Sequence, residues 1–205
     1  DSGEPTGLIL EMGVFLSQRL GRLRDQKETD EGIVGLSRLL LSYGITSIHD
    51  ASANNSLVRW DAIRSLQTSG LLQCRVTMLG GASHLGDFLA EGRRWGDGDH
   101  WLRLGHLKTM LSLTTGGLFP DIEELARIVH AAHQSGFPVA VHAVEQEAVT
   151  AAVQVFQGTP AMPSRSMPRD RIEHCAECPP ELAAQVWHSG AMVVTQPGFI
   201  FWNGD

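Results

Sequence analysis

Three side chains with metal-binding chemistry stand where short apolar segments of the sequence end: Lys108, His142 and His174. Neutral imidazole is a good zinc ligand near pH 7. A protonated lysine has no lone pair to donate, but an amine that has taken up carbon dioxide becomes a carbamate, whose oxygens can bridge two metal ions. The three residues therefore predict a zinc site. A second interpretation stays open, because the spacing also fits two core histidines and a lysine in an ion pair.

Two further polar residues, His49 and Gln196, end other segments of the same kind. We expect both to line the substrate pocket, although His49 also suits a structural hydrogen bond. Glu173 directly precedes His174 in the sequence. Side chains alternate along a strand, so Glu173 is predicted to face the opposite side, in a salt bridge with Arg171.

The segments that would position these residues are apolar and β-branched, and helical patterns separate most of them. Consecutive apolar residues are typical of strands buried on both faces, and apolar residues three or four apart mark one face of a helix. Asp121, with Glu124 three residues on, is a predicted N-cap. His130 and His133 are expected on the solvent side of that helix. The predicted strands are 45–48, 75–79, 102–104, 139–141, 171–172 and 192–194, and the predicted helices are 31–43, 121–135, 145–156 and 180–188.

Glycine marks the joins between helices and strands. Gly44, Gly70, Gly136 and Gly190 each follow a helical pattern and precede a strand, a place that favours a left-handed residue. Repeated helix–glycine–strand joins indicate βα units. A complete eight-unit barrel takes about 250 residues, more than the 205 of this chain. Periodicity alone therefore leaves open an incomplete barrel and an open, doubly wound sheet.

Composition argues against several other classes of protein. The formal charge is −7 and no Lys/Arg cluster offsets it, so a nucleic-acid binder is not expected. No run of about eighteen apolar residues predicts a membrane span, and the first residues lack the features of a secretory leader. The three cysteines do not make a disulfide framework, so Cys175-x-x-Cys178 is interpreted as reduced thiols in a cytoplasmic protein. Nucleophile-elbow, Walker and dinucleotide-binding signatures are absent.

Several stretches together resemble the amidohydrolase superfamily, and within it a branch of hydrolases similar to N-substituted formamide deformylase. They occur in the order found in the family and span nearly the whole chain. The stretches are Gly-Glu-Pro-Thr-Gly at 3–7, Tyr-Gly-Ile-Thr-Ser-Ile-His-Asp-Ala at 43–51, Val-Ala-Val-His-Ala-Val at 139–144, Arg-Ile-Glu-His-Cys at 171–175 and Thr-Gln-Pro at 195–197.

The resemblance implies an α/β fold, a (β/α)8 TIM barrel with one or two zinc-type ions. In the family the ligands are a His-x-His pair on the first strand, a lysine on the fourth, single histidines on the fifth and sixth, and an aspartate on the eighth. Lys108, His142 and His174 match the middle three, with a lysine carbamate at Lys108. The His-x-His pair is absent, and the sequence stops before the strand that would carry the aspartate, which is the family's general base.

The same resemblance predicts a partial barrel with strands two to seven present and the first and eighth missing. Residues 1–205 then form one incomplete domain, with a lead-in hairpin and loop over 1–30 and βα units over 31–205. Unpaired sheet edges of such a domain predict self-association.

The expected function is hydrolysis of a C–N bond in a small amide-like substrate by a metal-activated water, with this chain inactive alone. One alternative is a non-catalytic binding or regulatory domain that keeps the barrel scaffold. The other is a complete six-stranded transferase or binding module in which His142 and His174 are core residues.

Overall fold

The computed structural model describes residues 16, 19, 25–113, 116–160 and 168–198, and within them six parallel strands form one sheet. The strands pair in chain order, each with the next. They are β1 (Ser47–Asp50), β2 (Arg75–Gly81), β3 (Leu102–Met110), β4 (Val139–Ala143), β5 (Arg171–His174) and β6 (Met192–Val194). The helices are α2 (Gln26–Ser42), α3 (Leu57–Thr68), the short 3₁₀ turn η2 (Ala82–His84), α4 (Leu85–Ala90), α5 (Ile122–Gln134), α6 (Gln146–Gly158) and α7 (Pro180–Ser189).

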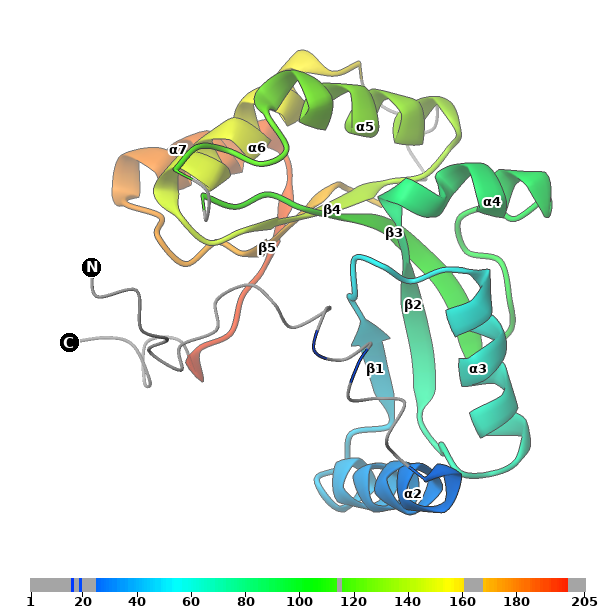
Figure 1. Cartoon of the computed structure of the whole chain (residues 1–205). Helices are drawn as coiled ribbons and strands as arrows, with labels where there is room; N and C mark the ends of the chain where they lie inside the picture. The colour runs from blue at the N-terminus through cyan, green and yellow to red at the C-terminus, as the bar shows by residue number, and fades with distance from the viewer. Residues whose placement is uncertain (1–15, 17–18, 20–24, 114–115, 161–167, 199–205) are drawn as a thin grey trace, which may run out of the picture.

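The strand order decides between the two folds that periodicity left open. A doubly wound sheet reverses its strand order at a switch point and carries helices on both faces. Here the order runs straight from β1 to β6, and helices α3 to α7 cover the outer side of the sheet (Figure 1). The fold is therefore a curled half-barrel, consistent with a partial TIM barrel.

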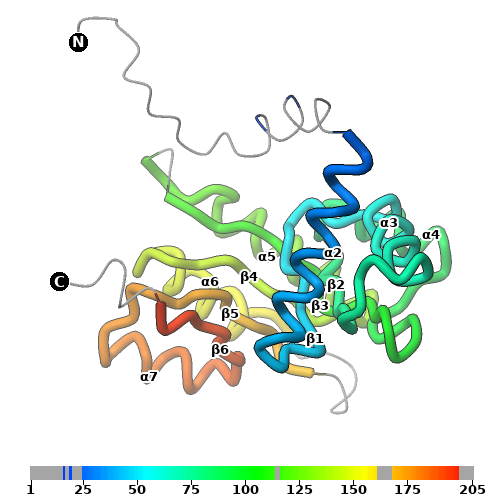
Figure 2. Tube along the Cα trace, turned by 90° about the horizontal axis from the view of Figure 1, so that it is seen from below, coloured from blue at the N-terminus to red at the C-terminus, as the bar shows by residue number. Residues whose placement is uncertain are grey.

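A hydrogen bond across the concave side shows how strongly the sheet curls. Nη1 of Arg171 on β5 donates to Nδ1 of His49 on β1 at 3.1 Å. Four inter-strand spacings separate these strands, which would be about 19 Å in a flat sheet. Two side chains in hydrogen-bonding contact require β1 and β5 to face each other, and the view from below shows the same curl (Figure 2). The complete, open six-stranded alternative is thereby disfavoured.

The glycine joins and the N-cap predicted from the sequence are confirmed. Gly44, Gly70, Gly136 and Gly190 have φ values of 72°, 75°, 75° and 74°, in the left-handed region that favours glycine. The side chain of Asp121 accepts a hydrogen bond from the backbone N–H of Glu124 at 2.8 Å, which caps α5.

Other elements differ from the predictions. Helix α2 begins at Gln26, inside the predicted lead-in, and most of the predicted hairpin and loop lies outside the described residues. Helix α4 was not predicted, and β3 runs over nine residues rather than three. His133 does not face solvent: it is 6% exposed and bonds to Asp170.

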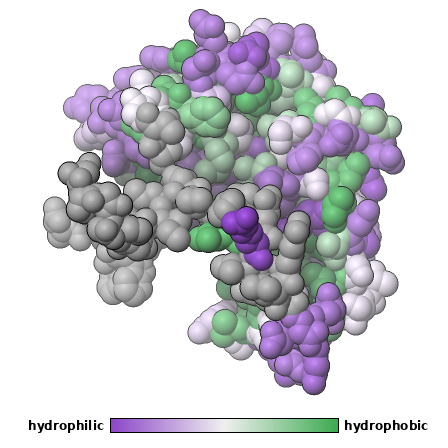
Figure 3. All heavy atoms as spheres, in the orientation of Figure 1, coloured by the Kyte–Doolittle hydropathy of each residue, from purple (hydrophilic) through white to green (hydrophobic). Residues whose placement is uncertain are grey.

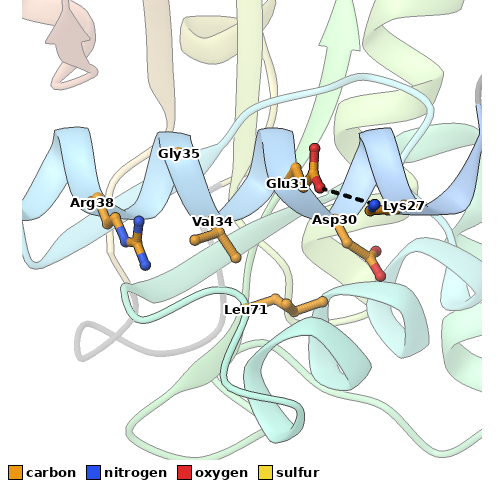
Figure 4. Close-up of a pocket in the computed structure, with 7 residues that line it drawn as sticks. All are labelled: Lys27, Asp30, Glu31, Val34, Gly35, Arg38 and Leu71. Atoms are coloured by element: carbon orange, nitrogen blue, oxygen red, sulfur yellow. Dashed lines mark ion pairs between the residues drawn. The ribbon is translucent and has the colours of Figure 1, made fainter.

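The outer surface has a polar upper part and a groove beside α2. Hydrophilic side chains predominate over the upper helices, with apolar residues between them (Figure 3). A groove of about 620 Å³ runs along α2, floored by Val34 and Leu71 and edged by charged residues that include the Lys27–Glu31 ion pair (Figure 4). It contains none of the predicted ligands. None of the helices in the described ranges is long and apolar enough to cross a membrane.

Candidate metal centre

Strand β4 shows which side chains face the concave side. Val139, Val141 and Ala143 belong to the hydrophobic core that the sheet shares with its covering helices. Alternation along the strand therefore directs Ala140 and His142 to the opposite, concave face. His142 is half-buried there, and the two strands on either side supply its polar neighbours.

Lys108 reaches the same face because β3 contains an extra residue. Met78 pairs with Leu104 and Gly80 with Leu107, so two residues of β2 oppose three of β3. Such a bulge reverses the alternation that follows it. Leu104 and Leu107 both belong to the outer core, which places Lys108 on the concave side.

His174 owes its position to an unusual backbone at the end of β5. Its φ is 75° and that of Cys175 is 51°, two consecutive left-handed residues that are not glycine. Alternation stops at such a turn. Ile172 packs in the outer core, so Glu173 faces the concave side, where the His174 ring also lies. The prediction that Glu173 points away from the site was wrong, whereas its predicted salt bridge with Arg171 is present at 2.8 Å.

The two predicted histidine ligands lie side by side. The ring centroids of His142 and His174 are 4.5 Å apart, with an interplanar angle of 73°. Imidazoles separated by more than about 8 Å could not bind one ion or an adjoining pair, given metal–nitrogen bonds of ~2 Å. The observed separation satisfies this condition. Nδ1 of His174 lies 2.7 Å from Oε1 of Gln196, so Nδ1–H donates and Nε2 carries the lone pair.

Burial shapes the electrostatics of this cluster. Lys108 is 3% exposed, and burial lowers its pKa to about 8, with Glu173 opposing the shift and Arg171 adding to it. Burial also lowers the pKa of His142 to about 4, and the electrostatic effects of the neighbouring His174 and Lys108 act in the same direction. His142 is therefore a neutral imidazole at pH 7, the form that binds metal.

The predicted pocket residues have different surroundings. Gln196 contacts His174, as above, and His49 accepts from Arg171. Arg171 and Glu173 form a buried ion pair on the concave face, each about 5% exposed or less. Sequence reasoning treated this pair as structural and did not connect it with His49. Their i, i+2 spacing placed both on one face of β5 as predicted, but this face proves to be the concave one.

The donor set fits a metal ion if Lys108 contributes. No group of three His, Cys, Asp or Glu side chains in the described part of the chain is arranged to hold an ion. Two imidazoles and one buried lysine are gathered, and the lysine can join them as a carbamate oxygen. Two nitrogens and an oxygen suit zinc.

Comparison with known proteins identifies the family of the chain. A model described as the amidohydrolase family matches residues 1–205, the whole chain. The chain belongs to the amidohydrolase family. The superfamily predicted from the motifs is thereby confirmed. No curated protein matches the chain.

Solved structures share the fold of this amidohydrolase chain. An uncharacterized metal-dependent hydrolase from Pyrococcus furiosus superimposes with a TM-score of 0.70 at 18% identity, over 94% of this chain and 43% of that one. An uncharacterized metal-dependent hydrolase from Pyrococcus horikoshii OT3 superimposes with a TM-score of 0.69 at 23% identity, over 96% of this chain and 43% of that one. Guanine deaminase from C. acetobutylicum, with bound guanine, superimposes with a TM-score of 0.51 at 10% identity, over 92% of this chain and 45% of that one. The chain spans less than half the length of these structures.

Proposed function

We propose that the protein containing this chain hydrolyses C–N bonds of small amide-type substrates at a divalent metal centre, zinc suiting the donors best. His142, His174 and Lys108 would hold the ion. The observation that carries this proposal is the meeting of two imidazoles, 4.5 Å apart, with a buried lysine on one concave face. We further assign the six strands to strands two to seven of the barrel, and the protein to the branch similar to N-substituted formamide deformylase.

Lys108 has the chemistry that carbamate formation requires. With its pKa lowered to about 8, roughly a tenth of the amine is unprotonated at pH 7. The neutral amine attacks carbon dioxide, a C–N bond forms, and one proton leaves for solvent. The product is an anion with oxygen donors in place of a cation. Carbamate formation removes the buried positive charge of Lys108 beside His142, and this favours the carbamate at this position.

The remaining residues orient the site and bind substrate. Gln196 fixes the tautomer of His174, so that its lone pair is on Nε2. A bound ion would supply Lewis-acid activation of water and of the substrate carbonyl. Met110, which pairs with His142 on the neighbouring strand and is 41% exposed, offers apolar contact to the substrate.

Cobalt titration tests the metal site directly. We expect the chain to bind Co²⁺ with a visible absorption band, and His142→Ala and His174→Ala each to abolish it. His188→Ala is the matched control, since His188 lies on α7 and bonds to Ala184 of the same helix. Unchanged Co²⁺ binding by His142→Ala would refute the ligand assignment. Bound metal without turnover of N-formyl and N-acyl compounds by the full-length protein would favour a binding domain over an enzyme.

We also propose that the exposed edges of the sheet mediate self-association. Ile45 precedes edge strand β1 and is 39% exposed, and Met192 and Val193 on edge strand β6 are 47% and 40% exposed. Unpaired strand edges with apolar side chains favour pairing with another chain. Light scattering that gives the monomer mass over a wide concentration range would contradict this.

A further inference from the structure

The concave face carries a hydrogen-bonded chain of three residues that the metal-site proposal does not use. Nε of Arg171 donates to Oε1 of Glu173 at 2.8 Å, and Nη1 of Arg171 donates to Nδ1 of His49 at 3.1 Å. The Arg171 and Glu173 side chains are 6% and 5% exposed. His49 lies at the exposed end of this chain, on β1.

The side of the sheet on which His49 lies follows from its neighbour. Ile48 packs against the hydrophobic core under the helices. His49 alternates with it and so faces the concave side, as its contact with Arg171 requires. Lys108, His142 and Glu173 face the same side, so His49 shares the concave face with the candidate metal centre and reaches it through Arg171 and Glu173.

Arginine determines which nitrogen of His49 carries the proton. A guanidinium has only donors, so the nitrogen that it contacts must present a lone pair. Nδ1 of His49 is therefore unprotonated, and the only proton of the neutral ring is on Nε2. The paired Glu173 neutralises the guanidinium and holds its plane. Among the described residues Nε2 of His49 has no hydrogen-bond partner.

We propose that His49 presents a neutral Nε2–H to the carbonyl oxygen of an amide substrate, and that Arg171 and Glu173 are positioning residues that set this tautomer. The inference rests on the proposed amide-hydrolase function and names a substrate-binding contact within it. A positioned N–H donor stabilises the charge that develops on a carbonyl oxygen under attack. Burial and the charge of Arg171 lower the pKa of His49, which keeps the ring neutral and agrees with this assignment.

The first test is the tautomer of His49 in the metal-free protein. Long-range ¹H–¹⁵N correlation spectra at about pH 8, above the usual histidine pKa, distinguish the two tautomers, and His49→Gln identifies the signals of residue 49. We expect the Nε2–H form. A His49 ring that carries its proton on Nδ1 would overturn the inference without any further variant.

A matched pair of variants tests the role of the ion pair. Arg171→Met combined with Glu173→Gln removes both buried charges together, so that neither is left alone. We expect His49 to shift to a mixture of tautomers. Arg75→Met is the control, because Arg75 also lies on a strand and hydrogen-bonds to Ser47 and Thr46 but does not contact His49. The same tautomer in the double variant as in the wild type would contradict the positioning role.

Formamide, the simplest amide, tests the substrate contact. We expect a saturable shift of the His49 Nε2 signal on addition of formamide, reduced at least severalfold in the double variant. The signals of His188, on the outer helix, should not move. No saturable shift at His49, or an equal one at His188, would overturn the inference. These spectra need no metal and no turnover, so failure to bind Co²⁺ would refute the proposed metal centre separately.

Discussion

The hydrogen bonds between His133 and Asp170 give a quantitative prediction about stability. Nε2 of His133 on α5 lies 3.0 Å from both carboxylate oxygens of Asp170, and Nδ1 lies 3.2 Å from the carbonyl oxygen of Pro160. Both ring nitrogens thus face acceptors, which only the doubly protonated ring satisfies. Asp170 also accepts the backbone N–H of Val139 at 2.8 Å. The pair therefore joins α5, the start of β4 and the residue before β5.

Asp170→Asn should destabilise the protein by about 1.5–3 kcal/mol, the value of a hydrogen bond to a charged group. The asparagine oxygen can keep the bond from Val139, but its NH₂ group would face the N–H of His133. Screening is limited, because the His133 and Asp170 side chains are 7% and 14% exposed. Asp87→Asn is the matched control: the His84–Asp87 pair has the same 3.0 Å distance on the surface, where a pair contributes about 1 kcal/mol or less.

The pH dependence has a definite sign. Burial acts to lower the pKa of His133, but the hydrogen bond and charge of Asp170 and the carbonyl of Pro160 outweigh it, so the pKa is raised above 6.5. Because the pKa of His133 is higher in the folded state than in the unfolded state, its protonation stabilises the fold. This stabilisation is complete below about pH 6.5 and is lost as the pH rises through the pKa of the folded state. The stability difference between wild type and Asp170→Asn should therefore be largest at about pH 6 and smaller in alkaline solution.

Urea unfolding measures this difference. With a slope of about 2 kcal/mol/M, the midpoint should fall by about 1 M at pH 6. The histidines whose pKa is lowered are present in both the wild type and Asp170→Asn, so their contributions cancel in the difference between the two free energies of unfolding. A difference no greater than that of Asp87→Asn, or one that widens as the pH rises, would refute the assignment of a charged His133.

Four further predictions concern other residues. Burial lowers the pKa of His106 to about 4, so the wild type should lose about 3 kcal/mol more than His106→Gln as the pH falls from 6.5 to 4 in urea unfolding. Gly35→Ala should stabilise α2 by about 0.5–1 kcal/mol, since a Cβ there meets nothing within 4 Å. Gly98→Ala should destabilise the protein by about 2–3 kcal/mol, because φ is 120° and the added Cβ would overlap the carbonyl oxygen of Leu102; thermal melting compares the two glycine variants. Gln196→Leu should weaken Co²⁺ binding about 10–100-fold while Gln196→Glu, which keeps an acceptor for His174, should not.

Local signals in the sequence were sufficient for the repeating unit of the fold. A left-handed glycine between a helix and a strand is a property of the backbone and needs no tertiary contact, so Gly44, Gly70, Gly136 and Gly190 could be placed in advance. Lys108, His142 and His174 could be selected because parallel strands bring their carboxyl ends to one edge.

Features set by tertiary structure could not be obtained in that way. The bulge in β3 and the left-handed backbone at His174 change which side of the sheet a residue faces. No pattern in the sequence predicts either feature. The bond between His49 and Arg171 joins residues 122 positions apart and exists because the sheet curls. The position of Glu173 on the concave face was missed because side-chain alternation holds within a strand but fails at its end, where His174 has a left-handed backbone.

The uniform direction of the strands gives the protein one rim that lies far from the candidate site. The joins at Gly44, Gly70, Gly136 and Gly190 lie where strands begin, at the end of the sheet remote from His142 and His174. A fluorophore, a purification tag or a tether to a solid support attached at that rim would leave the mouth of the site open to solvent. Libraries of variants that are intended to accept new substrates should instead vary residues on the opposite rim, where the strands end.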